Sequence, residues 1–123
     1  MCSRPVSSKS RGDEGEDRAA DWLRSRGCHI VKRNLRCRSG EVDIIVYKDG
    51  SLVFVEVKTW LTVPLEDLER SIGGRKRSRL LNCAREFVAA HPEWNACRLR
   101  FDIVHVGPEI THFAGAFTEN GFL

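Results

Sequence analysis

Two runs of alternating apolar residues flank an Asp-Gly pair between residues 41 and 58. Residues 41–48 read Glu-Val-Asp-Ile-Ile-Val-Tyr-Lys, Asp49-Gly50 follows, and residues 51–58 read Ser-Leu-Val-Phe-Val-Glu-Val-Lys. Asp-Gly between two apolar runs favours a two-residue type I′ turn, because both central positions of that turn need positive φ. The pattern therefore predicts a β-hairpin from Glu41 to Lys58, with Lys48 opposite Ser51.

The predicted turn determines which side chains face each other. Because side chains alternate along a strand, one face of the hairpin has a defined set of opposed residues. These pairs are Tyr47–Leu52, Ile45–Phe54, Asp43–Glu56 and Glu41–Lys58. The other face is aliphatic and has to pack on a core. It consists of Val42, Ile44, Val46, Val53, Val55 and Val57.

Asp43 and Glu56 are the chemically informative pair of the hairpin. Directly opposed residues have Cβ atoms about 4.5 to 5.5 Å apart, and like charges there destabilise a sheet. A divalent cation would offset the repulsion, since Mg²⁺ is typically held by one or two carboxylates with waters and phosphate oxygens. Lys58 lies two residues beyond Glu56, about 7 Å along the strand, so its ammonium can reach a water or phosphate on that cation.

The alternative interpretation is a solvated outer face of the hairpin with a Glu41–Lys58 salt bridge. Ile45, Leu52 and Phe54 share that face and mark it as half-buried, where unpaired acids are costly. The pattern therefore favours the cation-binding interpretation and leaves the salt bridge as its competitor.

The residues before the hairpin predict a helix and a strand. A helix is expected from Asp13, as its N-cap, to Arg26, with Gly27 ending it. Within it, Glu16 precedes the apolar stripe formed by Ala19, Ala20 and Leu23 at helical spacing, so Glu16 is expected to point inward. Residues 29–37 predict a strand that leads into the hairpin.

The residues after the hairpin predict one more helix and two more strands. Residues 60–70 form a polar connection that could cover the face carrying the acids. A helix is predicted from Ser71 or Gly74 to His91, ended by Pro92. Strands are expected over residues 98–106 and 110–117. This order predicts an α/β (α+β) sandwich, in which a mixed sheet with the hairpin at its core is flanked by helices.

Length and composition place the chain among ordinary globular proteins. Its 123 residues, 41% hydrophobic and 30% charged, predict a flexible tail over residues 1–10 and a single domain over 11–123. No apolar run approaches the ~20 residues of a membrane helix. The first ten residues lack the hydrophobic core of a secretory signal, so a cytoplasmic location without membrane contact is expected.

The cysteines and histidines suggest no redox or zinc chemistry. The five cysteines are an odd number with no C-x-x-C pair, which argues against a disulfide framework and a zinc site. They are Cys2, Cys28, Cys37, Cys83 and Cys97. We expect reduced thiols that pack as small core or boundary residues. The four histidines show no ligand spacing, and none is assigned a role.

Basic residues are concentrated in two blocks, although the net charge is only +3. The first block holds Arg24, Arg26, Lys32, Arg33, Arg36 and Arg38, and the second holds Arg75, Lys76, Arg77 and Arg79. Either block alone is typical of a solvated face. Together they contain half of the 20 Lys and Arg residues and bracket the acidic hairpin, which favours binding of a polyanion near a metal site.

Several motifs carry a resemblance to a known family. An acid on the first helix, an Asp on one hairpin strand and Glu-x-Lys on the next resemble the PD-(D/E)xK nuclease superfamily, with its restriction-endonuclease-like fold. More narrowly, the chain resembles the YraN family of small bacterial proteins, which are related to archaeal Holliday junction resolvases. The resemblance includes Gly12-Asp-Glu-Gly-Glu16, Gly40-Glu-Val-Asp-Ile-Ile45, Val53-Phe-Val-Glu-Val-Lys58 and Arg100-Phe-Asp-Ile-Val104.

The resemblance implies roles for individual residues. It implies that Asp43, Glu56 and the backbone carbonyl of Val57 bind Mg²⁺ or Mn²⁺, with Glu16 at the metal directly or through water. It implies that Lys58 activates or orients the attacking water. The family has a basic residue shortly after Glu-x-Lys where this chain has Trp60, which puts one phosphate contact in doubt.

The sequence therefore predicts a metal-dependent endonuclease acting on DNA, selective for branched or junction structures and without a small-molecule cofactor. The residues expected to grip the DNA backbone are Arg33, Arg36, Arg38, Arg75, Lys76, Arg77 and Arg79. Such contacts position a duplex without reading its sequence. Related resolvases act as dimers, so a homodimer is left open. The alternatives are a non-catalytic nucleic-acid-binding module on a nuclease scaffold and, more distantly, a purely protein-binding domain.

Overall fold

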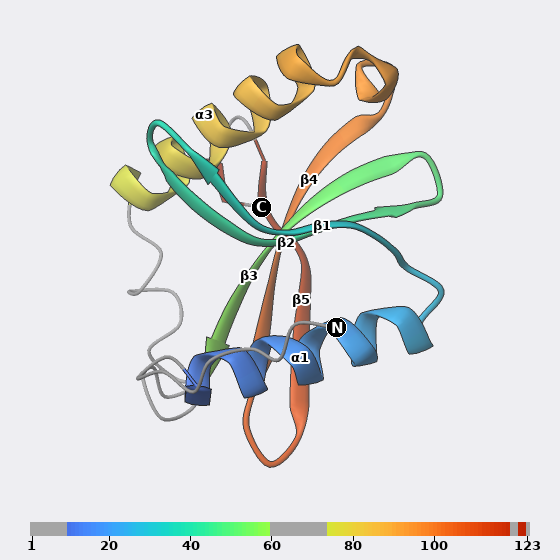
Figure 1. Cartoon of the computed structure of the whole chain (residues 1–123), viewed down its shortest axis with the longest axis vertical. Coiled ribbons are helices and arrows are strands. Elements are labelled where there is room, and N and C mark those ends of the chain that lie inside the picture. Colours follow the sequence, from blue (N-terminus) through green and yellow to red (C-terminus); the bar gives the residue numbers. More distant parts are fainter. Residues whose placement is uncertain (1–9, 60–73, 119–120, 123) are drawn as a thin grey trace, which may run out of the picture.

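The structure is a three-layer sandwich, with one helix on each face of a central sheet (Figure 1). It is a computed structural model that describes residues 10–59, 74–118 and 121–122. The described strands form a six-stranded sheet in the order β1-β2-β3-β4-β5-β6. Only the β3–β4 pair is parallel among them, so the sheet is mixed and the predicted α+β sandwich is confirmed.

The element bounds agree closely with the predicted ones. The helices are α1 (Ser10–Ser25), α3 (Gly74–Ala90) and the short 3-10 helix η2 (Pro92–Trp94). The strands are β1 (His29–Cys37), β2 (Gly40–Lys48), β3 (Ser51–Thr59), β4 (Arg98–Val106), β5 (Ile110–Thr118) and β6 (Gly121–Phe122). The predicted connection over residues 60–70 and most of the predicted tail lie outside the described residues. Ser10, assigned to that tail, is instead the first residue of α1.

The central hairpin has the predicted turn. Asp49 and Gly50 have φ values of 51° and 81°, as a type I′ turn requires. Pairing of β2 with β3 runs from Lys48–Ser51 through Ile45–Phe54 to Ile44–Val55. The same register places Asp43 level with Glu56, but backbone pairing has ended there, and the predicted Glu41–Lys58 pair is not formed.

The neighbouring strand β1 is irregular beside the point where the β2–β3 pairing ends. Asn34 of β1 lies between the residues paired with Ile44 and Val42 and has φ 54°, a left-handed value that Asn tolerates better than most residues. Strict alternation of side chains does not continue through such an irregular strand. Val42 was predicted to share the aliphatic face with Ile44, and this was wrong, because Val42 packs in the opposite core cluster.

Two hydrophobic clusters hold the helices on the sheet. The first, under α3, contains Val42, Ile45, Leu52, Phe54, Leu80, Cys83, Ala84, Phe87, Phe101 and Ile103. The second, under α1, contains Ala19, Ala20, Leu23, Cys28, Ile44, Val46, Val53, Val55, Val104 and Val106. Both faces of β3 are therefore buried, as expected for a central strand beside a parallel neighbour.

Helix α1 ends as predicted but begins earlier. The Gly27 N–H donates to the Arg24 carbonyl and the Cys28 N–H to the Leu23 carbonyl, both at 3.0 Å, and Gly27 has φ 85°. This is a Schellman ending, which needs a residue that tolerates left-handed φ. Asp13 was predicted as the N-cap, which was wrong, because the helix already starts at Ser10.

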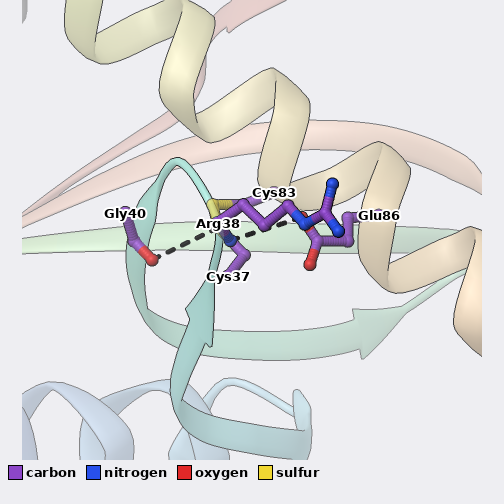
Figure 2. Close-up of a disulfide and its surroundings, with 5 residues drawn as sticks. All are labelled: Cys37, Arg38, Gly40, Cys83 and Glu86. Atoms are coloured by element: carbon purple, nitrogen blue, oxygen red, sulfur yellow. Dashed lines mark hydrogen bonds between the residues drawn. A yellow bond between two sulfur atoms is a disulfide. The ribbon is translucent and has the colours of Figure 1, made fainter.

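Cys37 and Cys83 form a disulfide, so the prediction that all the cysteines are reduced was wrong for this pair (Figure 2). Cys37 ends β1 and Cys83 lies on the buried face of α3, and their Cα atoms are 5.6 Å apart, within the normal range for a disulfide. The two are 46 positions apart in the chain, so local spacing gave no signal. Cys28 and Cys97 are free thiols, as predicted.

Candidate functional site

Asp43 lies where β2 separates from β3. Its carboxylate, rather than a backbone carbonyl of β2, accepts a hydrogen bond from β3. Its Oδ2 accepts a hydrogen bond of 2.8 Å from the Val57 backbone N–H. Burial, followed by the negative charge of Glu56, raises the pKa of Asp43 to about 7, and the Val57 N–H opposes the shift. A bound cation would oppose both causes, because it favours the charged form of the carboxyl.

Glu56 receives two ammonium groups on one oxygen. Its Oε1 lies 3.2 Å from Lys58 Nζ and 2.6 Å from Lys76 Nζ. Lys58 comes from the same strand, whereas Lys76 reaches down from α3. Burial and then the adjacent Lys76 lower the pKa of Lys58. Burial also disfavours the charge on Lys76, but Glu56 outweighs it, so the Lys76 pKa is raised.

Asp43 and Glu56 line one cavity of about 290 Å³ between β2, β3 and α3. Gly40 and Glu41 line it from β2, and Lys76 and Arg79 line it from α3. The Arg79 side chain packs against Gly40, since a Cβ on that glycine would lie 3.8 Å from Arg79 Cδ. The two acids predicted to face each other thus share a concave space with cations along one side.

Glu16, on α1, is not among the residues that line the cavity, but its charge acts on Asp43. It is buried, as predicted, and its charge contributes to the raised pKa of Asp43. Its Oε1 accepts a hydrogen bond of 3.2 Å from Arg33 Nε. Gly15 allows α1 to come this close, because a Cβ there would lie 2.6 Å from Thr59 Cγ2 at the end of β3.

A divalent cation fits the chemistry of this site, although the ligand set is small. Carboxylate and carbonyl oxygens are the ligands that Mg²⁺ prefers, and it keeps several waters. Within residues 10–59, 74–118 and 121–122, no three His, Cys, Asp or Glu side chains are grouped so as to hold a metal ion. Asp43 and Glu56 supply two carboxylates of the kind that Mg²⁺ accepts, and a backbone oxygen and waters would have to complete its coordination.

The predicted DNA-contacting residues differ in their surroundings. Arg33 is engaged inside the chain, with Nη2 2.6 Å from Asp17 Oδ1 as well as its bond to Glu16. Arg36 is exposed, and its Nε lies 3.4 Å from Glu41 Oε1. Arg38 is exposed in the β1–β2 turn. Arg77 is half-buried, and Arg79 is exposed at the cavity. The Arg75 side chain lies outside the described residues.

Sequence reasoning missed a second buried charged group. Asp102 on β4 is 1% exposed and accepts hydrogen bonds from Arg100, the Gly115 backbone N–H and, at 2.7 Å, His112 Nε2. Burial would raise the pKa of Asp102, but these hydrogen bonds outweigh it and the pKa lies below its usual value. The hydrogen bonds from His112 and Gly115 connect β5 to Asp102 on β4, at the register shift between Phe101 and Ile103. The alternation of apolar and polar residues gives no sign of this shift.

The contact between Lys76 and Glu56 was also missed. Lys76 was predicted as a DNA-backbone contact from its position in a basic block, and its ammonium lies closer to Glu56 Oε1 than that of Lys58 does. The signal that could have revealed this is its helical spacing with Leu80 and Ala84, which puts Lys76 on the buried face of α3.

The fold and the site define a class: a small α+β sandwich that gathers two acids and two lysines where its central hairpin opens. Residues 15–106 match the model of the family described as Uncharacterised protein family UPF0102. The chain belongs to this YraN-like family, so the predicted family is confirmed. None of the described helices has the length and apolar character needed to cross a membrane.

Curated relatives from several bacteria match most of the chain. A UPF0102 protein of Treponema pallidum is 42% identical over 100 residues, which is 81% of this chain and 79% of the relative. One from Solibacter usitatus is 41% identical over 116 residues, 89% of this chain and 86% of the relative. One from Alcanivorax borkumensis is 39% identical over 103 residues, 84% and 82% of the two chains.

Proposed function

We propose that this protein is a metal-dependent endonuclease that hydrolyses phosphodiester bonds in DNA, with a preference for branched structures. The observation that supports this most directly is that Asp43 and Glu56 line one cavity, with Lys58 beside Glu56. Two nearby carboxylates, one with a pKa of about 7, are an unfavourable arrangement unless a cation is used there. The resemblance to the PD-(D/E)xK nucleases supports the same chemistry.

Asp43, Glu56 and the Val57 carbonyl would hold Mg²⁺ or Mn²⁺. When bound, the cation would lower the pKa of a water and neutralise charge on the phosphoryl group. Glu16 would act on the same site from α1. The Val57 N–H orients the Asp43 carboxylate, because it occupies Oδ2 and leaves the other oxygen for a ligand.

Lys58 would place positive charge where negative charge grows during attack on phosphorus. Its pKa is lowered from the usual value, so its proton is less tightly held than that of an exposed lysine. Such a group can orient a water and stabilise a developing anion in a half-buried site. Arg79, exposed at the rim of the cavity, would contact the DNA backbone without reading bases.

The test is cleavage of a panel of duplex, single-stranded, flapped and four-way-junction DNA in Mg²⁺ or Mn²⁺. We expect metal-dependent cutting by the wild type, and losses of at least about 100-fold in Asp43→Ala and Lys58→Ala. Lys48→Ala is the matched control, since Lys48 is at the other end of the same hairpin, where its Nζ donates to the Arg26 carbonyl. Equal cutting by wild type and both site variants would reveal a contaminant and refute the proposal.

A non-catalytic DNA-binding module is the second candidate. It is favoured by the two ammonium groups that already neutralise Glu56, and by the absence, within the described residues, of a third acid grouped to hold a metal. It predicts that the protein binds DNA with strong salt dependence but cuts no substrate in the panel with either metal.

A further inference from the structure

The two lysines at Glu56 are not equivalent. Lys76 Nζ lies 2.6 Å from Glu56 Oε1, and Lys58 Nζ lies 3.2 Å from the same atom. The Lys58 side chain is 16% exposed and is fixed on the central strand, whereas that of Lys76 is 31% exposed and projects from the first turn of α3. Lys76 is therefore both the closer ion-pair partner and the one with room to move.

A lysine in this position stands where a divalent cation would bind. Charge supplies the first argument: the Lys76 ammonium gives Glu56 Oε1 positive charge that a coordinated Mg²⁺ or Mn²⁺ would otherwise supply. Geometry supplies the second, because Glu56 Oε1 already accepts two donors at hydrogen-bond distance. A cation that coordinated this oxygen would meet like charge a few ångströms away, in a half-buried site where repulsion is poorly screened.

We propose that Lys76 is a tethered counter-ion that neutralises Glu56 in the metal-free protein and has to be displaced when a divalent cation binds. This inference rests on the proposed function, since it takes the same carboxylates as the metal site. The displaced ammonium stays at the cavity that Lys76 lines, where it can contact a phosphate of the nucleic acid. Lys76 is thus a positioning residue that delays metal binding until an anion is available for its charge.

The body of α3 can stay in place while Lys76 moves. One turn further on, Leu80 is buried, and Cys83 and Ala84 are fully buried in the cluster beneath the helix. Cys83 is also bonded to Cys37 at the end of β1 (Figure 2). The exchange therefore needs only rotation about the four-carbon stem of one lysine, which is rapid compared with helix movement.

The test is Mn²⁺ titration of the purified full-length chain by calorimetry, without DNA. We expect Lys76→Met to lower the Mn²⁺ dissociation constant about tenfold, equal to ~1.4 kcal/mol, because the competing ammonium is gone. Lys76→Arg keeps the charge and should stay within about twofold of the wild type. Arg85→Met is the matched control, since it removes one exposed cation from the same helix, more than two turns away. It should also stay within about twofold.

Asp43→Asn separates this inference from the proposed function. If the wild type binds Mn²⁺ and Asp43→Asn abolishes binding, the metal site stands. Unchanged or weaker Mn²⁺ binding by Lys76→Met would then overturn the counter-ion role alone. If Arg85→Met also bound Mn²⁺ more tightly than the wild type, the counter-ion role would be overturned, because the gain in affinity would come from the change in net charge. Absence of Mn²⁺ binding in the wild type and in Lys76→Met would overturn both proposals.

Discussion

Replacing Asp43 by Asn should stabilise the metal-free protein at neutral and alkaline pH. The pKa of Asp43 is raised from 3.8 to about 7, so ionising this carboxyl costs free energy in the folded state. A shift of about 3 units corresponds to at most ~4 kcal/mol. The Asn amide oxygen can still accept the Val57 N–H, so only the charge is removed. Allowing for relaxation around the charge, we expect a gain of about 2 to 4 kcal/mol.

The sign of the pH dependence follows from the direction of the shift. Below pH 3.8 the carboxyl is protonated in both states, and the wild type carries no penalty. Between about pH 4 and pH 7 the unfolded chain loses this proton while the folded chain keeps it, so the wild type loses stability as pH rises. Above about pH 7 the folded protein carries the full free-energy cost of the ionised Asp43 carboxylate. Asp43→Asn lacks this contribution, so its advantage should grow across the same window.

The assay is thermal unfolding in EDTA at several pH values from 4 to 8. For a chain of this length we expect Asp43→Asn to raise Tm by roughly 6 to 15 °C at pH 8 and by little at pH 4. Asp49→Asn is the matched control, because Asn-Gly also forms a type I′ turn and Asp49 is exposed in the same hairpin. Excess Mg²⁺ should stabilise the wild type but not Asp43→Asn.

Two results would refute this reasoning. If Asp43→Asn were less stable than the wild type in EDTA at pH 8, Asp43 would be a satisfied ion-pair partner rather than an unpaired acid. If the difference in Tm were the same at pH 4 and pH 8, the effect would not come from the ionisation of this carboxyl.

Two further predictions concern the framework of the fold. Asp102→Ala should destabilise the protein by about 3 kcal/mol at pH 7 in urea unfolding, because Arg100 and His112 lose their buried partner. Since the Asp102 pKa is lowered, this cost should shrink as pH falls below about 4, and a constant cost would exclude the charge as its source. Cys37→Ser should lower the stability of the oxidised protein by about 2 to 4 kcal/mol. A thiol reductant should destabilise the wild type but not Cys37→Ser, and equal responses would mean that the Cys37–Cys83 bond does not form in solution.

The site was predictable as far as local chain geometry determines it. Asp49-Gly50 allows a type I′ turn, that turn fixes the register, and the register brings Asp43 level with Glu56. Glu16 could be placed on a buried helix face because helical periodicity is also a local property. In each case the information lies within a single hairpin or a single helix.

What the sequence could not supply depends on contacts between distant segments. The Cys37–Cys83 bond and the Lys76–Glu56 ion pair both require knowing that α3 lies over β1 and β2, which no spacing in the chain encodes. The change in the orientation of Val42 coincides with a left-handed residue in the neighbouring strand, Asn34. Period-two alternation assumes a regular pleat, so it fails where β2 leaves its partner.

The bond between Cys37 and Cys83 makes part of the backbone a closed covalent ring. Asp43, Glu56, Lys58 and Lys76 are all members of this ring, whereas Glu16 lies outside it. A protease that cuts one peptide bond within the ring would leave a single molecule on a non-reducing gel. Only after a thiol is added would that molecule separate into two fragments, so a nicked chain could keep its acids and lysines together.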